Sequence, residues 1–149
     1  MKKKIVLFII FSLVSLMFSR VMANCPAFKD IRIKGGYFIA VSNGQLWQSV
    51  NKTDITTVNP GKIYLWRALF TNVNKNHSTS VACAYHIVGK KIDFELQPIK
   101  SNVTYKIEPS RSWKVYDKGN KRVCLALINQ RFTPENCPFK MKKPWWKFW

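Results

Sequence analysis

The sequence begins with an export signal, and all of its cysteines follow that signal. Three lysines at positions 2–4 precede an apolar run at residues 5–18, and Val21-Met22-Ala23 supplies the small residues that a signal peptidase needs. We expect cleavage after Ala23; the alternative is an uncleaved signal anchor, although the apolar run is shorter than the roughly 20 residues of a membrane span. Because exported chains fold where thiols are oxidised, the sequence predicts a disulfide-bonded protein that is periplasmic or secreted.

The four cysteines, Cys25, Cys83, Cys124 and Cys137, allow three pairings. We favour Cys25 with Cys83 and Cys124 with Cys137, because the first bond ties down the mature N-terminus and the second closes a loop that turns back on itself. A metal site is the alternative, since Cys83 and His86 form a C-x-x-H. Residues three apart on a strand point to opposite faces, and no second pair of ligands has zinc-like spacing. We therefore predict structural disulfides, no metal and no cofactor.

Beyond residue 23 the sequence has the pattern of short β-strands separated by turn residues. Ile92, Phe94 and Leu96 share one face of a strand whose other face is polar, and Ser42-Asn43-Gly44 is a strong hairpin signal. Strands are expected at residues 37–41, 46–50, 63–71, 80–88, 92–97, 103–107, 112–116 and 122–128. The sequence predicts an all-β fold, an antiparallel β-sandwich or small barrel of about eight short strands, stabilised by disulfides.

The length of the chain allows one folded domain with one core. We expect a signal peptide at residues 1–23, a β domain at 24–137 and a basic tail at 138–149. The strand at 122–128 is apolar on both of its faces. It is therefore expected to be central in its sheet and covered on both sides.

Several short motifs follow one another in order through the first half of the chain. They are Cys25-Pro26, Tyr37-Phe38-Ile39-Ala40, Leu46-Trp47, Arg67-Ala68-Leu69-Phe70, Cys83-Ala84-Tyr85 and Ile92-Asp93-Phe94-Glu95-Leu96. This order resembles a family of small exported bacterial proteins of unknown function, with an N-terminal Cys-Pro and a mid-chain Cys-x-Tyr. The resemblance covers residues 25–97. It implies a β-rich fold and a disulfide between those two cysteines, and it carries no known activity or catalytic residues.

The C-terminal tail interleaves lysine with tryptophan, and no acidic residue follows Glu135. Indole rings favour the membrane interface, and each lysine near an anionic surface adds about 1 kcal/mol of binding free energy. The alternative is that the aromatic side chains fold back and cover an edge of the β domain. The residues expected to bind a membrane or another anionic surface are Lys140, Lys142, Lys143, Trp145, Trp146, Lys147, Phe148 and Trp149.

The charge balance also favours anionic partners, since 25 lysines and arginines stand against seven acidic residues. Our leading hypothesis is an exported, non-enzymatic binding protein whose tail docks on an anionic membrane or envelope polyanion. The alternative is a secreted effector or inhibitor that binds an acidic protein through its β domain. Export makes nucleic acid a poor match as a partner.

A catalytic set is not evident. His77 and His86 are the only histidines. Asp93 and Glu95 lie on one face of a predicted strand, about 7 Å apart, which suits a carbohydrate-active hydrolase with two carboxylates. That face is the polar side of an amphipathic strand, so we expect it to be solvated and the protein not to be an enzyme. Arg67 is a single charged residue within an apolar run. We expect it to pair with an acidic residue or to lie at the edge of the sheet.

Overall fold

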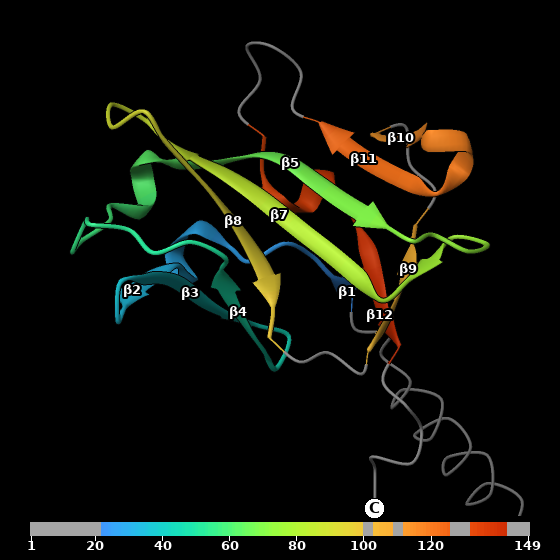
Figure 1. The fold of residues 1–149 in the computed structure, drawn as a ribbon, viewed down its shortest axis with the longest axis horizontal. Coiled ribbons are helices and arrows are strands. Elements are labelled where there is room, and N and C mark those ends of the chain that lie inside the picture. The colour runs from blue at the N-terminus through green and yellow to red at the C-terminus, as the bar shows by residue number, and fades with distance from the viewer. Residues whose placement is uncertain (1–21, 100–102, 109–111, 126–131, 143–149) are drawn as a thin grey trace, which may run out of the picture.

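The computed structural model describes residues 22–99, 103–108, 112–125 and 132–142, whose strands form two antiparallel sheets (Figure 1). The larger sheet has the order β10-β11-β5-β7-β8-β4-β3-β2, and the smaller has the order β1-β12-β9-β6. No helix in these ranges is long and apolar enough to span a membrane. The apolar run of the expected signal lies outside the described residues.

The strands of the larger sheet are β2 (Arg32–Lys34), β3 (Tyr37–Ser42), β4 (Gln45–Ser49), β5 (Ile63–Thr71), β7 (Ser80–Ile87), β8 (Ile92–Pro98), β10 (Trp113–Tyr116) and β11 (Lys121–Leu125). Those of the smaller sheet are β1 (Met22–Ala23), β6 (His77–Ser78), β9 (Thr104–Ile107) and β12 (Phe139–Lys142). Short 3-10 turns form η1 (Phe28–Asp30), η2 (Pro60–Lys62), η3 (Asp117–Gly119) and η4 (Pro134–Asn136). These elements confirm the predicted all-β, antiparallel fold.

The hairpin between β3 and β4 follows from its turn residues. Ser42 pairs with Gln45, which leaves Asn43 and Gly44 as a two-residue loop. Both loop residues are left-handed, with φ of 52° and 72°. Asparagine and glycine tolerate that conformation better than other residues, and the resulting turn matches the twist of the strands it joins. The sequence signal and the structure agree here.

An aromatic cluster joins the two sheets. The ring centroid of Phe70 on β5 lies 5.2 Å from that of Phe139 on β12 and 6.0 Å from that of Tyr105 on β9. The rings of Tyr105 and Phe139 are 5.7 Å apart. All three side chains are fully buried. The smaller sheet therefore packs, through β9 and β12, against strand β5 of the larger sheet.

The central, doubly covered strand is β7. Of the strand expected at 122–128, the structure describes residues up to Leu125, in β11, and 126–128 lie outside the described residues. β11 lies between β5 and the short β10, and of its residues only Cys124 is buried, with Leu125 39% exposed. On β7 the outward side chains of Ala82 and Ala84 are buried as well as the inward ones. The prediction for the strand at 122–128 was wrong because only the four-residue β10 lies beyond β11 in the sheet, which leaves most of the β11 side chains partly exposed.

The β domain continues beyond Cys137, the end expected from the sequence. Phe139 is fully buried and Met141 packs against the core, while Lys140 and Lys142 alternate with them on β12. This is the period-two pattern of a half-exposed strand, hidden by the lysine-rich composition of the segment. On the side away from β9, β12 pairs with β1 (Met22–Ala23). Cleavage after Ala23 would therefore leave β12 at the edge of the smaller sheet.

Two disulfides hold the core together, Cys25–Cys83 and Cys124–Cys137, and these are the pairs favoured from the sequence. All four cysteines are buried. The first bond ties the N-terminal segment to β7, and the second ties β11 to the chain just before β12. Two disulfides of this kind indicate folding in an oxidising, extracellular or periplasmic environment.

A buried hydrogen bond accompanies the first disulfide. The hydroxyl of Tyr85 donates to the carbonyl oxygen of Pro26 at 2.8 Å. Tyr85 is fully buried, and burial raises its pKa well above the ordinary value of 10.0. The Cys25-Pro26 segment is thus bound to β7 at two points, by Cys83 and by Tyr85.

Replacing this tyrosine, as Tyr85→Phe, is expected to lower the free energy of unfolding by about 1–3 kcal/mol at neutral pH, because the Pro26 carbonyl loses its donor. In the wild type the unfolded state ionises first, since the pKa of Tyr85 is higher in the folded state. Its contribution is therefore complete below about pH 10 and declines as the pH rises further. Urea unfolding at about pH 8 and about pH 11 checks both effects.

The matched control is Tyr116→Phe, which removes a hydroxyl from an exposed tyrosine. We expect this control to keep the wild-type alkaline loss and Tyr85→Phe to reduce it. Equal alkaline losses in the two variants would show that burial of Tyr85 does not control the alkaline response.

Candidate functional site

The predicted surface-binding segment begins inside the fold. Lys140 and Lys142 belong to β12, where Lys142 is exposed and the side chain of Lys140 is 24% exposed. The other residues predicted to bind a surface lie outside the described residues: Lys143, Trp145, Trp146, Lys147, Phe148 and Trp149. The strand β12 therefore presents the first part of the basic segment from the smaller sheet.

Strand register adds a further lysine to this surface. Lys140 on β12 lies directly opposite Lys106 on β9, and Lys142 lies opposite Thr104. Tyr105 and Ile107 are buried on the other face of β9, which directs Lys106 outward with the β12 lysines. We call Lys106, Lys140 and Lys142 the basic face.

The basic face carries an unfavourable contact. Two lysines directly opposite each other in a sheet repel, at a cost of a few tenths of a kcal/mol or more. The Nζ atom of Lys140 lies 3.0 Å from Oε1 of Glu108, an ion pair whose atoms are not aligned for a hydrogen bond. Lys106 and Lys142 take part in no ion pair among the described residues. An anion bound at this face would relieve the remaining repulsion.

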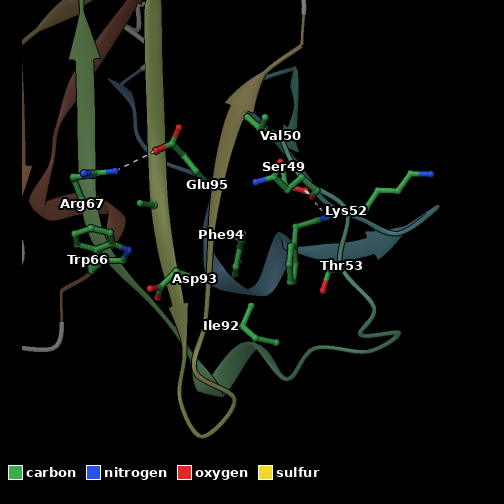
Figure 2. A pocket seen from close by; sticks show the side chains of 13 residues that line it. Ser49, Val50, Lys52, Thr53, Trp66, Arg67, Ile92, Asp93, Phe94 and Glu95 are labelled. Atoms are coloured by element: carbon green, nitrogen blue, oxygen red, sulfur yellow. Dashed lines mark hydrogen bonds and ion pairs between the residues drawn. The ribbon is translucent and has the colours of Figure 1, made fainter.

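A second feature is a cavity of about 440 Å³ beside β8 (Figure 2). Figure 2 shows β8 between Trp66 and Arg67 on one side and the chain at residues 49–53 on the other. Asp93 and Glu95 both line this cavity. Its volume lies within the usual range of ligand pockets, about 300–1,000 Å³.

An ion pair and a hydrogen bond lie on the polar face of the three central strands. Register places Arg67, Ala84 and Glu95 in one row, and Arg67 Nη2 reaches over the alanine to Glu95 Oε2 at 3.3 Å. The row below pairs His86 Nδ1 with Asp93 Oδ1 at 2.6 Å. Arg67 therefore pairs with an acidic residue, which is the first of the two outcomes expected for it. The polar face of β8 was expected to be solvated, and its two carboxylates also contact side chains of neighbouring strands.

Arg67 is positioned by a bulge in β5 and by an aromatic ring. The register between β5 and β7 shifts between Leu65 and Arg67, which gives Trp66 the extra position of the bulge. The guanidinium carbon lies 4.6 Å from the centroid of the Trp66 ring. Trp66 Nε1 and Arg67 Nε are buried and have no hydrogen-bond partner among the described residues. Bulges are over-represented beside functional sites, and a buried donor without a partner requires a physical explanation.

The side chains that line this cavity offer charged and hydrogen-bonding groups. Groups of three or more metal-ligating side chains do not occur in the part of the chain that the structure describes. Cys83 is held in a disulfide, so Cys83 and His86 do not form a ligand pair. Asp93 and Glu95 are each paired with a neighbouring side chain.

Three charged residues that line the cavity, Arg67, Asp93 and Glu95, were evident from the sequence, but the cavity itself was not. Asp93, Glu95 and Arg67 stood out as charges, whereas the gap beside β8 depends on where β4 ends. The sequence signal for that end is weak: Val50 is apolar and continues the expected strand at 46–50, whereas β4 ends at Ser49.

Comparison with known proteins places the β domain in a family but not in a functional class. No curated protein and no solved structure matches the chain. The model of a family described as a protein of unknown function (DUF3757) matches residues 20–140, a longer stretch than the resemblance at 25–97. Whether the Cys-Pro and Cys-x-Tyr motifs mark that family stays a prediction. The chain therefore belongs to the DUF3757 family, and the match runs from β1 into β12.

Proposed function

We propose that this protein is an exported, non-enzymatic binding protein that docks on an anionic membrane or envelope polyanion through its basic C-terminal segment. The observation that carries the proposal is the basic face, where Lys106 and Lys140 lie opposite each other and Lys142 is exposed. The chain then continues from Lys142 into the Trp-rich residues 143–149. In this proposal the lysines of the sheet and the cationic aromatic segment that follows them contact the same anionic surface.

The physical case combines charge with interfacial burial. Each lysine near an anionic surface contributes about 1 kcal/mol, which alone gives weak binding. Burial of part of several indole and phenyl rings brings the affinity toward the micromolar range. Because lysine charges are screened by salt, the binding is expected to weaken as ionic strength rises.

The test is co-sedimentation of the mature protein with neutral and anionic vesicles at low and high salt. Truncation after Lys142 keeps β12 intact and is expected to abolish binding to anionic vesicles. The double variant Lys106→Gln/Lys142→Gln removes two cations from the basic face and is expected to weaken binding about tenfold or more.

The matched control is Lys114→Gln/Lys118→Gln, which removes two exposed lysines from β10 and η3. It changes the net charge equally, so an equal loss of binding would show that total charge acts and not the basic face. Direct binding of soluble polyphosphate without vesicles tests a polyanion partner, and vesicle binding tests a lipid surface. Binding that neither salt nor the truncation changes would contradict the proposal.

A further inference from the structure

Strand β8 has an open edge for part of its length. β4 pairs with β8 only from Trp47 opposite Pro98 to Ser49 opposite Leu96. β8 begins at Ile92, so its first half has no strand on that side among the described residues. The cavity described above lies along this half.

The register identifies which backbone groups face the opening. The N–H of Ile99 donates to the carbonyl of Leu46, so the odd-numbered residues of β8 direct their backbone groups toward β4. Val88 N–H donates to the carbonyl of Lys62, so the even-numbered residues of β7 direct their backbone groups toward β5 and the odd-numbered ones toward β8. The odd-numbered residues of β7 lie opposite even-numbered residues of β8, which therefore direct their backbone groups toward β7. The N–H and C=O groups of Asp93 and the N–H of Glu95 thus face the cavity, whereas the pairing of Ser49 with Leu96 places Val50 N–H opposite the C=O of Glu95.

The opening is built by specific contacts and is not a frayed end. The buried Ser49 hydroxyl accepts from Phe38 N–H at 3.1 Å and donates to Asn51 carbonyl at 2.8 Å. Thr53 N–H donates to Gly36 carbonyl at 2.7 Å. These bonds turn the chain after β4 toward β3, away from β8, and so hold the gap open.

We propose that this edge binds an extended peptide segment, which adds a strand beside β8 and pairs with the backbone of Asp93 and the N–H of Glu95. Strand addition supplies the missing partners for these backbone groups and gives affinity from the peptide main chain. This site is distinct from the basic face and does not depend on the proposed membrane docking.

The surroundings of the edge define the side chains of the peptide. Residues directly opposite in a sheet share a face, so a residue opposite Phe94 lies beside Ile92 and the stacked rings of Phe94 and Phe38, whose centroids are 3.8 Å apart. A small apolar, β-branched side chain suits this place. Residues opposite Asp93 and Glu95 lie on the paired polar face. There an added cation competes with Arg67 and an added anion meets two carboxylates, so uncharged hydrogen-bonding side chains fit best.

The probe is the capped peptide acetyl-Thr-Val-Thr-Val-Thr-amide, and the readout is amide hydrogen exchange by NMR on the mature protein. In the free protein the amides of Asp93 and Glu95 are expected to exchange at least about tenfold faster than those of Phe94 and Leu96. Millimolar peptide is expected to protect Asp93 and Glu95 and to leave the other exposed amides unchanged.

Two controls isolate the backbone contribution. The same peptide with alternate N-methyl groups keeps its side chains but cannot pair, and its affinity is expected to fall about tenfold or more. Glu95→Ala and Glu95→Pro both lose the carboxylate, but only proline removes the outward N–H. We expect Glu95→Ala to keep peptide protection at Asp93 and Glu95→Pro to lose it.

Three results would overturn the proposal: equal exchange at Glu95 and Phe94 in the free protein, equal binding of the N-methylated peptide, or no protection by millimolar peptide. Vesicle binding by Glu95→Pro is expected to match the wild type. Failure of strand addition therefore leaves the membrane proposal to be judged separately.

Discussion

The double replacement Cys25→Ala/Cys83→Ala is expected to lower the free energy of unfolding by about 4 kcal/mol. This disulfide links residues 58 apart in the sequence, so its loss greatly increases the conformational entropy of the unfolded chain. Alanine leaves no free thiol and no buried hydroxyl at either position. For a small domain this is a large share of the total stability.

The second disulfide provides the comparison. Cys124 and Cys137 are 13 residues apart, so Cys124→Ala/Cys137→Ala is expected to cost less, about 3 kcal/mol. Urea unfolding followed by tryptophan fluorescence measures both double variants under the same conditions. A larger loss for the 13-residue loop would show that native-state contacts of the bond, and not chain entropy, set its contribution.

Phe70→Ala is expected to destabilise the protein by about 3–5 kcal/mol, because it leaves a cavity in the aromatic cluster between the sheets. The ring of Phe70 contacts Phe139, Tyr105 and Trp113, with centroids 5.2, 6.0 and 5.2 Å away. The smaller sheet contains short strands and depends on this packing. Hydrogen exchange is therefore expected to show the greatest loss of protection in β9 and β12.

The control for this prediction is Val115→Ala on β10, whose side chain is 61% exposed. It is expected to change the free energy of unfolding by less than about 0.5 kcal/mol. Uniform loss of protection across both sheets in Phe70→Ala would contradict the view that this residue mainly holds the smaller sheet. The variant also tests the basic face, since β12 carries two of its lysines.

Local pattern was sufficient to predict several elements. The strand at 63–71 coincides with β5, and Asn43-Gly44 forms the predicted turn. The favoured cysteine pairs are those of the structure. These features depend on side-chain alternation, on residues that tolerate positive φ and on the few ways of pairing four cysteines, all of which are visible in the sequence.

Lysine-rich and alanine-rich segments were misjudged because their place in the fold depends on distant partners. Phe139 is buried only because Phe70 and Tyr105 receive it, so the predicted tail at 138–149 begins as a strand. Ala84 is buried because the Arg67–Glu95 ion pair crosses over it.

The sequence by itself determined the all-β class, the strongly cationic character and most strand positions, since each follows from residues close together in the chain. Only the tertiary structure decided that Lys106 faces Lys140 and that the backbone N–H groups of Asp93 and Glu95 face a cavity. Both depend on strand register and on where a neighbouring strand ends. These are properties of segments far apart in sequence, and local patterns do not encode which of them will meet.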